Sequence, residues 1–332
     1  MPLGLFEGCR FILEAFPTSF RENTETRLFP EGNVLCFGFL TYCILIAVEK
    51  LPAWNGGTII EGLTECVGED AVIVATTLSQ WQIPSRLESN SVANDYYGQK
   101  VLQTLRKCGI ESVSSDDMVY STPVEISIVD HTGSRTYFQQ RDSVTLAKLK
   151  APSVQEYISA AILYVDWYDG PSVLNAIKRA RNFQIPIYSN IESMYHRASE
   201  IEDLLKLSDL CQVSMDEPDA SGDPNEIAKN LLAYGIGTVL ITMGSHGCLI
   251  AQRNQAFKIN SLVIDVVDGF GAGAAFSAGF IYGLRAGWPL AEIGKFATAH
   301  SGLQCAQVGR VNIPVDQVKS AGESLSIQQV IL

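Results

Sequence analysis

The chain has 332 residues, of which 47% are hydrophobic and 18% charged, a balance typical of globular proteins that argues against disordered and fibrous classes. Its length fits two domains, or one large α/β unit with an elaboration. Its net charge of −12, from 24 basic and 36 acidic residues, disfavours nucleic acid and anionic lipid as partners. A small anionic ligand stays compatible with this charge, because backbone amides at a helix N-terminus bind anions without a cationic side chain.

Cysteine and histidine usage indicates the compartment and the absence of a zinc site. The 8 cysteines form no CxxC pair and most lie in apolar runs. This pattern is typical of reduced, buried thiols in a cytoplasmic protein rather than of a disulfide framework. The 4 histidines form no cluster with each other or with cysteine, so no zinc centre is expected.

The N-terminal part of the chain starts with an extension, residues 1–32, that lacks the order of a signal peptide. Residues 34–48 carry no charge, but a bilayer span needs about 20 apolar residues. We therefore predict a buried central strand that runs into a second strand, and no membrane association.

The next elements combine helices and a hairpin. Residues 68–81 predict a buried helix and residues 97–107 an amphipathic one. Residues 119–141 are rich in β-branched and aromatic residues, with a turn at 130–133, and predict a hairpin. From 158 to 244, short apolar runs alternate with helical segments, which predicts a parallel sheet covered on both faces. Ligands of such sheets bind beyond the carboxyl ends of the strands.

A glycine-rich segment follows a second hairpin at 248–258. Residues 262–267 predict a strand, which enters the turn Asp268–Ala274 and then a helix of small residues. Glycines at 271 and 273 allow a ligand to approach the backbone, and unpaired amides of residues 271–274 would point outward at the positive end of the helix dipole. The segment therefore predicts an anion hole; close packing of the turn alone is the other interpretation.

This segment resembles the signature of the ribokinase (PfkB) family of carbohydrate kinases, whose usual form is D-T-x-G-A-G-D followed by A-F. The resemblance extends upstream over 239–250 and downstream over 296–309, and covers about 33–315. It implies a ribokinase-like three-layer α/β sandwich over 33–320, with a central, mostly parallel sheet. It also implies a small β-lid from about 40–65 and 119–141 and a C-terminal tail over 321–332.

The resemblance also implies ligands and site residues. The ligands are ATP, Mg²⁺, a sugar and, in some members, a monovalent cation. The residues matched to nucleotide-binding positions are Thr242, Gly244, Gly247, Asp268 and His300. The transferring phosphoryl group would be held by Gly271, Ala272 and Gly273, and Mg²⁺ would be held indirectly by Glu217. The residues matched to sugar-binding positions are Cys43, Gly68 and Asp70.

The chain departs from the family at the position of the proton acceptor, which is Ala274. A methyl group cannot take a proton, and a general base contributes about 10² to 10⁴ in rate. Cys43 and Ser214 also replace functional residues of the family.

The sequence therefore leaves two hypotheses, a sugar kinase with weak or absent turnover and a non-catalytic pseudokinase that binds ligands or partners. If only the base is missing, Ala274→Asp should raise turnover at least about tenfold. Exposed lid edges predict a homodimer through the lid.

Overall fold

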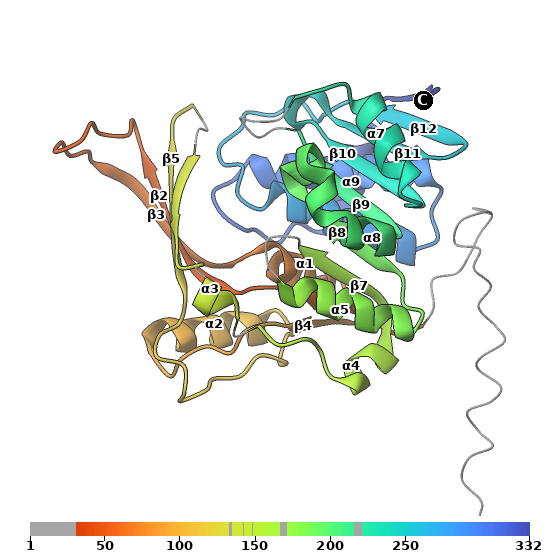
Figure 1. The fold of residues 1–332 in the computed structure, drawn as a ribbon. Coiled ribbons are helices and arrows are strands. Elements are labelled where there is room, and N and C mark those ends of the chain that lie inside the picture. Colours follow the sequence, from red (N-terminus) through yellow and green to blue (C-terminus); the bar gives the residue numbers. More distant parts are fainter. Residues whose placement is uncertain (1–30, 133–134, 142, 148, 167–170, 216–220) are drawn as a thin grey trace, which may run out of the picture.

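The computed structural model describes residues 31–132, 135–141, 143–147, 149–166, 171–215 and 221–332. Two sheets organise this part of the chain (Figure 1). The large sheet has the order β13-β12-β11-β10-β9-β8-β7-β1-β4, in which neighbours from β4 to β10 are parallel. Its strands are β1 Asn33–Phe37, β4 Ser85–Glu88, β7 Ala160–Asp166, β8 Ile187–Asn190, β9 Leu210–Ser214, β10 Thr238–Thr242, β11 Cys248–Gln252, β12 Gln255–Ile259 and β13 Ile327–Val330.

Helices cover both faces of the large sheet and produce two apolar cores. One core lies against the helices α1 Asp70–Gln80, α2 Tyr96–Lys107, α8 Ala272–Arg285, α9 Leu290–Cys305 and α10 Val315–Glu323. The other core lies against α4 Val154–Ser159, α5 Pro171–Asn182, α6 Glu202–Leu207 and α7 Pro224–Ala233. The short elements α3 Ser143–Leu146, η3 Glu192–Ile201 and η4 Gly244–His246 complete the described helices. These three layers confirm the predicted ribokinase-like α/β sandwich.

The second sheet is small, with the order β3-β2-β5-β6, and projects from the body of the molecule (Figure 1). It consists of β2 Thr41–Val48, β3 Ile60–Gly68, β5 Val124–Asp130 and β6 Arg135–Gln139. In β2 and β5 alternate residues are buried, as expected for a sheet with one covered face. This sheet corresponds to the lid predicted over 40–65 and 119–141. The segment 34–48 is two strands as predicted, one in each sheet.

Two predictions about the end of the chain are wrong. Residues 262–267 form no strand, although Val263, Val266 and Val267 have high strand propensity. The reason is that β12 pairs with β11 on one side and with β13 on the other, so the large sheet offers this segment no free neighbour there. The second wrong prediction is the C-terminal tail, because residues 321–332 contain the end of α10 and the whole of β13.

No helix in the described ranges combines the length and the apolar character needed to cross a bilayer.

Candidate active site

The glycine-rich turn enters α8 with a sharp change of backbone direction. Gly271 precedes the helix with φ of 71°, in the left-handed region, and a Cβ there would meet Ile73 Cδ1 at 2.8 Å. Only glycine satisfies both conditions without strain. Gly273 has more room, since a Cβ built on it would lie 3.7 Å from Gln212 Nε2 and 3.7 Å from Glu192 Oε1. The first turn of α8 therefore lies directly beside a carboxylate that follows β8.

The backbone amides of the turn are only partly available. The amide of Ala272 donates to Gly269 O at 3.3 Å, so the prediction of four unpaired amides is wrong at this residue. The amides of Gly271, Gly273 and Ala274 have no acceptor among the described residues. These three amides lie at the positive end of the α8 dipole and can hydrogen-bond an anion.

Asp268 fixes the shape of the turn. Its side chain is buried, its Oδ1 accepts from Phe270 N at 2.9 Å, and its Oδ2 accepts from Gly309 N at 2.9 Å. Both oxygens are therefore occupied by backbone amides that hold the turn against the segment after α9. This is the loop-shaping role that the resemblance implies for Asp268, and its contact with a nucleotide stays a prediction.

Ala274 is fully buried and belongs to the apolar core beneath α8 and α1. An aspartate at this position would place a carboxylate among apolar side chains, which is costly unless the carboxylate is paired. Restoring the family's proton acceptor is therefore not a neutral change in this chain.

The turn after β10 holds the predicted Thr242, Gly244 and Gly247. Thr242 ends β10 and donates from Oγ1 to Val213 O at 3.2 Å. Gly247 has φ of 82°, and a Cβ there would lie 2.0 Å from Ile259 O, so the close approach of the β12 backbone requires glycine. The turn leaves the same edge of the sheet as β9, with which β10 pairs in parallel.

His300 does not lie in an open site. It is 1% exposed, its Nδ1 contacts Ala275 O at 2.7 Å, and its ring lies 4.6 Å from that of Trp81. Burial lowers the pKa of the imidazole to about 4, so the ring is neutral at pH 7. This face of α9 packs against α8 and the end of α1, and the proximity of His300 to a nucleotide base stays a prediction.

The inner face of the lid contacts the body of the molecule at the predicted sugar-binding residues. Cys43 is 1% exposed, and its Sγ occupies the space over Gly68, where a Cβ would lie 2.2 Å from the sulfur. The guanidinium of Arg135 lies 5.9 Å from the centre of the Phe270 ring in the glycine-rich turn. The lid is therefore positioned over the turn, and its buried thiol and the glycine fit each other sterically.

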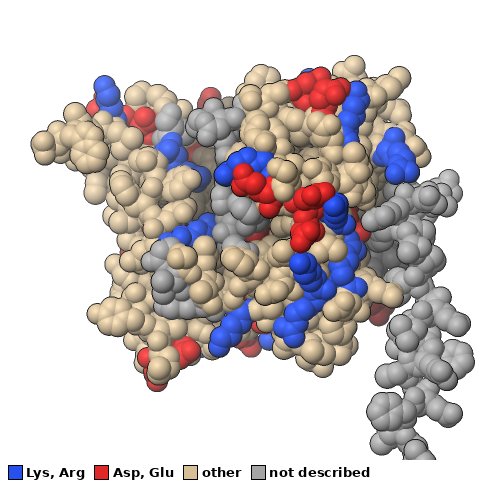
Figure 2. All heavy atoms as spheres, in the orientation of Figure 1, with Lys and Arg blue, Asp and Glu red and all other residues tan. Residues whose placement is uncertain are grey.

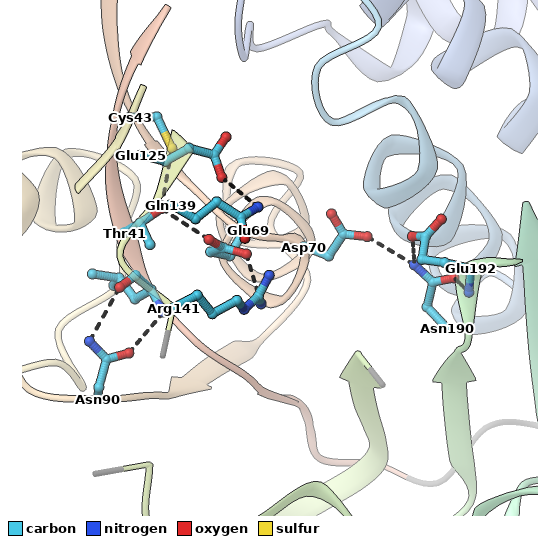
Figure 3. A network of polar contacts seen from close by, with 11 residues as sticks. Thr41, Cys43, Glu69, Asp70, Asn90, Glu125, Gln139, Arg141, Asn190 and Glu192 are labelled. Carbon is cyan, nitrogen blue, oxygen red and sulfur yellow. Dashed lines mark hydrogen bonds and ion pairs between the residues drawn. The ribbon is translucent and has the colours of Figure 1, made fainter. Parts of the chain in front are cut away.

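A polar network connects the lid with the start of α1 (Figure 3). Arg141 Nη2 and Glu69 Oε2 form an ion pair at 2.9 Å, and Thr41 Oγ1 donates to Glu69 Oε1 at 3.2 Å. Gln139 Nε2 donates to Glu125 Oε2 at 3.2 Å. Burial, followed by the charge of Glu69, raises the pKa of Glu125 to about 7. A cavity of about 320 Å³ adjoins this network and is lined by Asn90, Ser91, Val119, Ser121, Pro123, Gln139, Gln140, Arg141 and Thr145.

A second polar cluster lies where β7, β8 and α1 meet. Oxygens of Asp70, Asp166 and Glu192 lie within 4.8 Å of one another. Asn190 Nδ2 donates to Asp70 Oδ2 at 2.9 Å and also to Glu192 Oε1 (Figure 3). Burial, followed by the charge of Glu69, raises the pKa of Asp70 to about 6. Of the predicted sugar-binding residues, Asp70 is thus the one that joins a group of acidic side chains.

Buried polar residues form the floor beneath this acidic cluster. Tyr188 Oη and Ser277 Oγ both donate to Gln212 Oε1, at 2.5 and 2.7 Å. Gln212 Nε2 in turn donates to Gly273 O at 3.1 Å. The floor therefore connects the strands directly to the first turn of α8 and fixes its position relative to β8 and β9.

Carboxylates are the ligands that Mg²⁺ prefers, so the acidic cluster has suitable donors. Its geometry opposes a cation at one point, because the Asn190 amide group directs its own hydrogens at both Asp70 and Glu192. Glu217, the residue predicted to help hold Mg²⁺, lies outside the described residues.

The model of the pfkB family carbohydrate kinases matches residues 74–317. The chain belongs to this family. Structural neighbours of the PfkB protein include a ribokinase from Arabidopsis thaliana complexed with ribose and ATP. The two share 16% identity and a TM-score of 0.72 over 89% of this chain and 99% of the other.

Curated relatives of this PfkB protein include several kinases. A nucleoside kinase from Methanothermobacter thermautotrophicus is 23% identical over 301 residues, 86% of this chain and 93% of the relative. An ATP-dependent 6-phosphofructokinase from Thermoanaerobacterium thermosaccharolyticum is 30% identical over 125 residues. That match covers 36% of this chain and only 39% of the relative. The family implies ATP and a divalent cation in general, and sugars or nucleosides as small-molecule ligands.

Several site residues of this PfkB protein were missed by the sequence reasoning. Asp166 and Asn190 end β7 and β8, and Glu192 lies two residues after the end of β8. The rule that ligands bind at the carboxyl ends of parallel strands could have found all three. No sequence pattern predicts the ion pair between Glu69 and Arg141, because this contact depends on how the lid packs against the start of α1.

Proposed function

We propose that this protein transfers the γ-phosphoryl group of ATP to a hydroxyl group of a sugar or a related polyol. The observation that carries the proposal is the pairing of two features. One is the set of free amides at the start of α8; the other is the acidic cluster beside it at the ends of β7 and β8. Free amides suit phosphoryl oxygens, and carboxylates and amides suit hydroxyl groups.

The residues of the chain have distinct parts in this reaction. The amides of Gly271, Gly273 and Ala274 would bind the phosphoryl oxygens, where negative charge develops during transfer. Asp268 would hold the turn in shape, and the lid would exclude water from the reacting groups. A divalent cation bound with ATP would neutralise phosphate charge, with Glu217 as its expected indirect partner.

The acceptor is proposed as a polyhydroxyl compound because the carboxylates and the Asn190 amide of the acidic cluster are groups that bind hydroxyls. Among curated and solved relatives, one is a nucleoside kinase and another is a ribokinase with bound ribose. The direct test is a coupled ADP assay with a pooled set of pentoses, hexoses, polyols and nucleosides, in which phosphorylated products are identified by mass spectrometry. We expect one acceptor class to give product, and no product from any of them would contradict the proposal.

A second candidate is a non-catalytic protein that binds nucleotide or sugar and acts through a partner. The fully buried Ala274 favours it, because the family's usual proton acceptor is absent from that position. Calorimetry that shows binding of ATP or an acceptor without turnover would support this candidate. In that case Ala274→Asp should be tested together with a thermal-unfolding control, since the new carboxylate would be buried.

We also propose a cytoplasmic homodimer. The reduced thiols favour the cytoplasm, since all seven described cysteines are free. The outer face of the lid favours the dimer, because it carries a stripe of apolar side chains at alternate positions of β2 and β5, with one more from each of β3 and β6. The members of this outer stripe are Ile44, Ile46, Leu63, Ile126, Ile128 and Phe138.

A further inference from the structure

Glu192 is held in an unusual backbone conformation next to the site. Its φ of 47° lies in the left-handed region, which residues with a side chain rarely adopt. Asn190 holds it from two directions, accepting from Glu192 N at 3.3 Å through Oδ1 and donating to Glu192 Oε1 through Nδ2. Residues kept in such conformations are frequent at functional sites, where the surrounding structure maintains the strain.

The carboxylate of Glu192 lies beside the start of α8. Its Oε1 is 3.7 Å from a Cβ built on Gly273, which precedes the position where the family signature has its proton acceptor. Figure 3 shows the carboxylates of Asp70 and Glu192 both directed at the side-chain nitrogen of Asn190. The carboxylate of Glu192, the first residue of η3, thus reaches the first turn of α8 beside Gly273, the residue that precedes Ala274.

The floor of the cluster contains a buried tyrosine hydroxyl. Tyr164 is fully buried, and its hydroxyl has no hydrogen-bond partner in the part of the chain that the structure describes. It lies on the same face of β7 as Asp166, two residues further on, and the charges of Asp70 and Asp166 raise its pKa after burial itself. The nearby Ser277 hydroxyl donates to Gln212 and Gly273. An unpaired hydroxyl here suits a polar group of a bound acceptor.

We propose that Glu192 is the general base of this site and takes over the task that Ala274 cannot perform. This inference rests on the proposed function. The acceptor O–H bond breaks and its proton moves to a Glu192 carboxylate oxygen. The acceptor oxygen forms a bond to the γ-phosphorus of ATP. The bond from that phosphorus to the bridging oxygen breaks, and its electron pair stays on the β-phosphate of ADP. Solvent then receives the proton from Glu192.

Glu192 is preferred over the other two carboxylates by its position. Asp70 is the first residue of α1 and Asp166 ends β7, whereas Glu192 is the one that contacts the space around Gly273. A role as a cation ligand is the competing explanation, because the three carboxylates lie within 4.8 Å of one another. The experiment must therefore separate proton transfer from cation binding.

The first test compares Glu192→Gln with Glu200→Gln under the assay conditions above. Glutamine keeps an oxygen that can accept from Asn190 but cannot take a proton. Glu200 is a matched control on the same 3₁₀ segment, with a side chain 55% exposed. We expect kcat of Glu192→Gln to fall by about 10² to 10⁴ with unchanged ATP and acceptor affinity in calorimetry, and Glu200→Gln to keep the wild-type kcat.

The second test is chemical rescue. In Glu192→Ala, added formate should restore part of kcat, because a small carboxylate can occupy the vacated space and accept the proton. Recovery of Glu192→Gln turnover by excess Mg²⁺ or Mn²⁺ would instead make Glu192 a cation ligand and overturn the proposal. A wild-type kcat in Glu192→Gln would overturn the assignment of Glu192 alone. A wild-type protein without turnover on any acceptor would overturn both this inference and the proposed function.

Discussion

Glu125 projects from β5 onto the inner face of the lid, where its carboxyl is buried and has a pKa of about 7. Its ordinary pKa is 4.5, so between pH 4.5 and 7 the native state holds more protons than the unfolded chain. Stability is therefore expected to fall as pH rises through this window. From the size of the shift, this one group removes at most about 3 kcal/mol of unfolding free energy by pH 8.

Glu125→Gln should remove that pH dependence, because glutamine has the same shape and does not ionise. Urea unfolding at pH 4.5, 6, 7 and 8 measures the effect as a smaller loss of unfolding free energy in the variant than in the wild type. Glu61→Gln, an exposed carboxylate on β3, is the control and should keep the wild-type slope. An identical slope for Glu125→Gln and wild type would show that the buried carboxyl does not control stability.

Single residues were predictable from sequence where the backbone itself dictates the amino acid. Gly271 and Asp268 shape the turn by local constraints, and both were identified from the turn sequence. The burial of His300 was not predicted, because the packing of α9 on α8 decides which way its side chain points. Glu192 meets Gly273 only through the arrangement of β8, β9 and α8, so no local pattern in the sequence indicates that contact.

The start of α1 and the end of the lid are connected by one ion pair. Glu69 and Arg141 are 2.9 Å apart with side chains 9% and 12% exposed, and Glu69 precedes α1 with φ of 82°. Removing one partner of a buried pair leaves the other charge unpaired, so Arg141→Met should lower the unfolding free energy by about 2–4 kcal/mol. The double variant with Glu69→Gln should be less destabilised than the sum of the single changes.

Urea unfolding of the two single variants and the double variant gives the coupling energy of this ion pair. Lys178 and Asp203 provide a control pair, 3.4 Å apart with side chains 54% and 70% exposed. Their coupling should be below about 1 kcal/mol, because water screens exposed charges. A coupling between Glu69 and Arg141 as small as this would mean that the lid is not stabilised through α1.

At the level of elements, sequence predicted the order of helices and strands between 158 and 259 because each segment there is buried in a regular way. The prediction was wrong at 262–267, where β-branched residues suggested a strand. A segment with high strand propensity forms a strand only where a sheet edge is free to pair with it. Because β13 pairs with the outer edge of β12, residues 262–267 have no free edge there. That long-range pairing also explains why residues 321–332 were misjudged as a tail.

The surface of the whole molecule mixes both signs of charge, as Figure 2 shows for one face, and groups of both signs also lie on the projecting lid at the left. The net charge of −12 limits binding of polyanions, but the free amides of α8 bind anions locally. The negative net charge of the whole chain is therefore compatible with binding of a small anion by the amides at the start of α8. The apolar feature left to be explained is the outer stripe of the lid.

The outer stripe should mediate dimerisation, since Leu63 and Phe138 are 57% and 64% exposed and the isoleucines beside them are half-buried. Removing this apolar area from water would favour association of two lids. We expect a dimer in sedimentation-velocity experiments at micromolar concentration, and a monomer for Leu63→Lys combined with Ile126→Lys, with unchanged circular dichroism. Val263→Lys, at a site 96% exposed outside the lid, is the control and should remain dimeric. A monomeric wild type would contradict the prediction and leave the stripe as solvent-exposed cover of the lid.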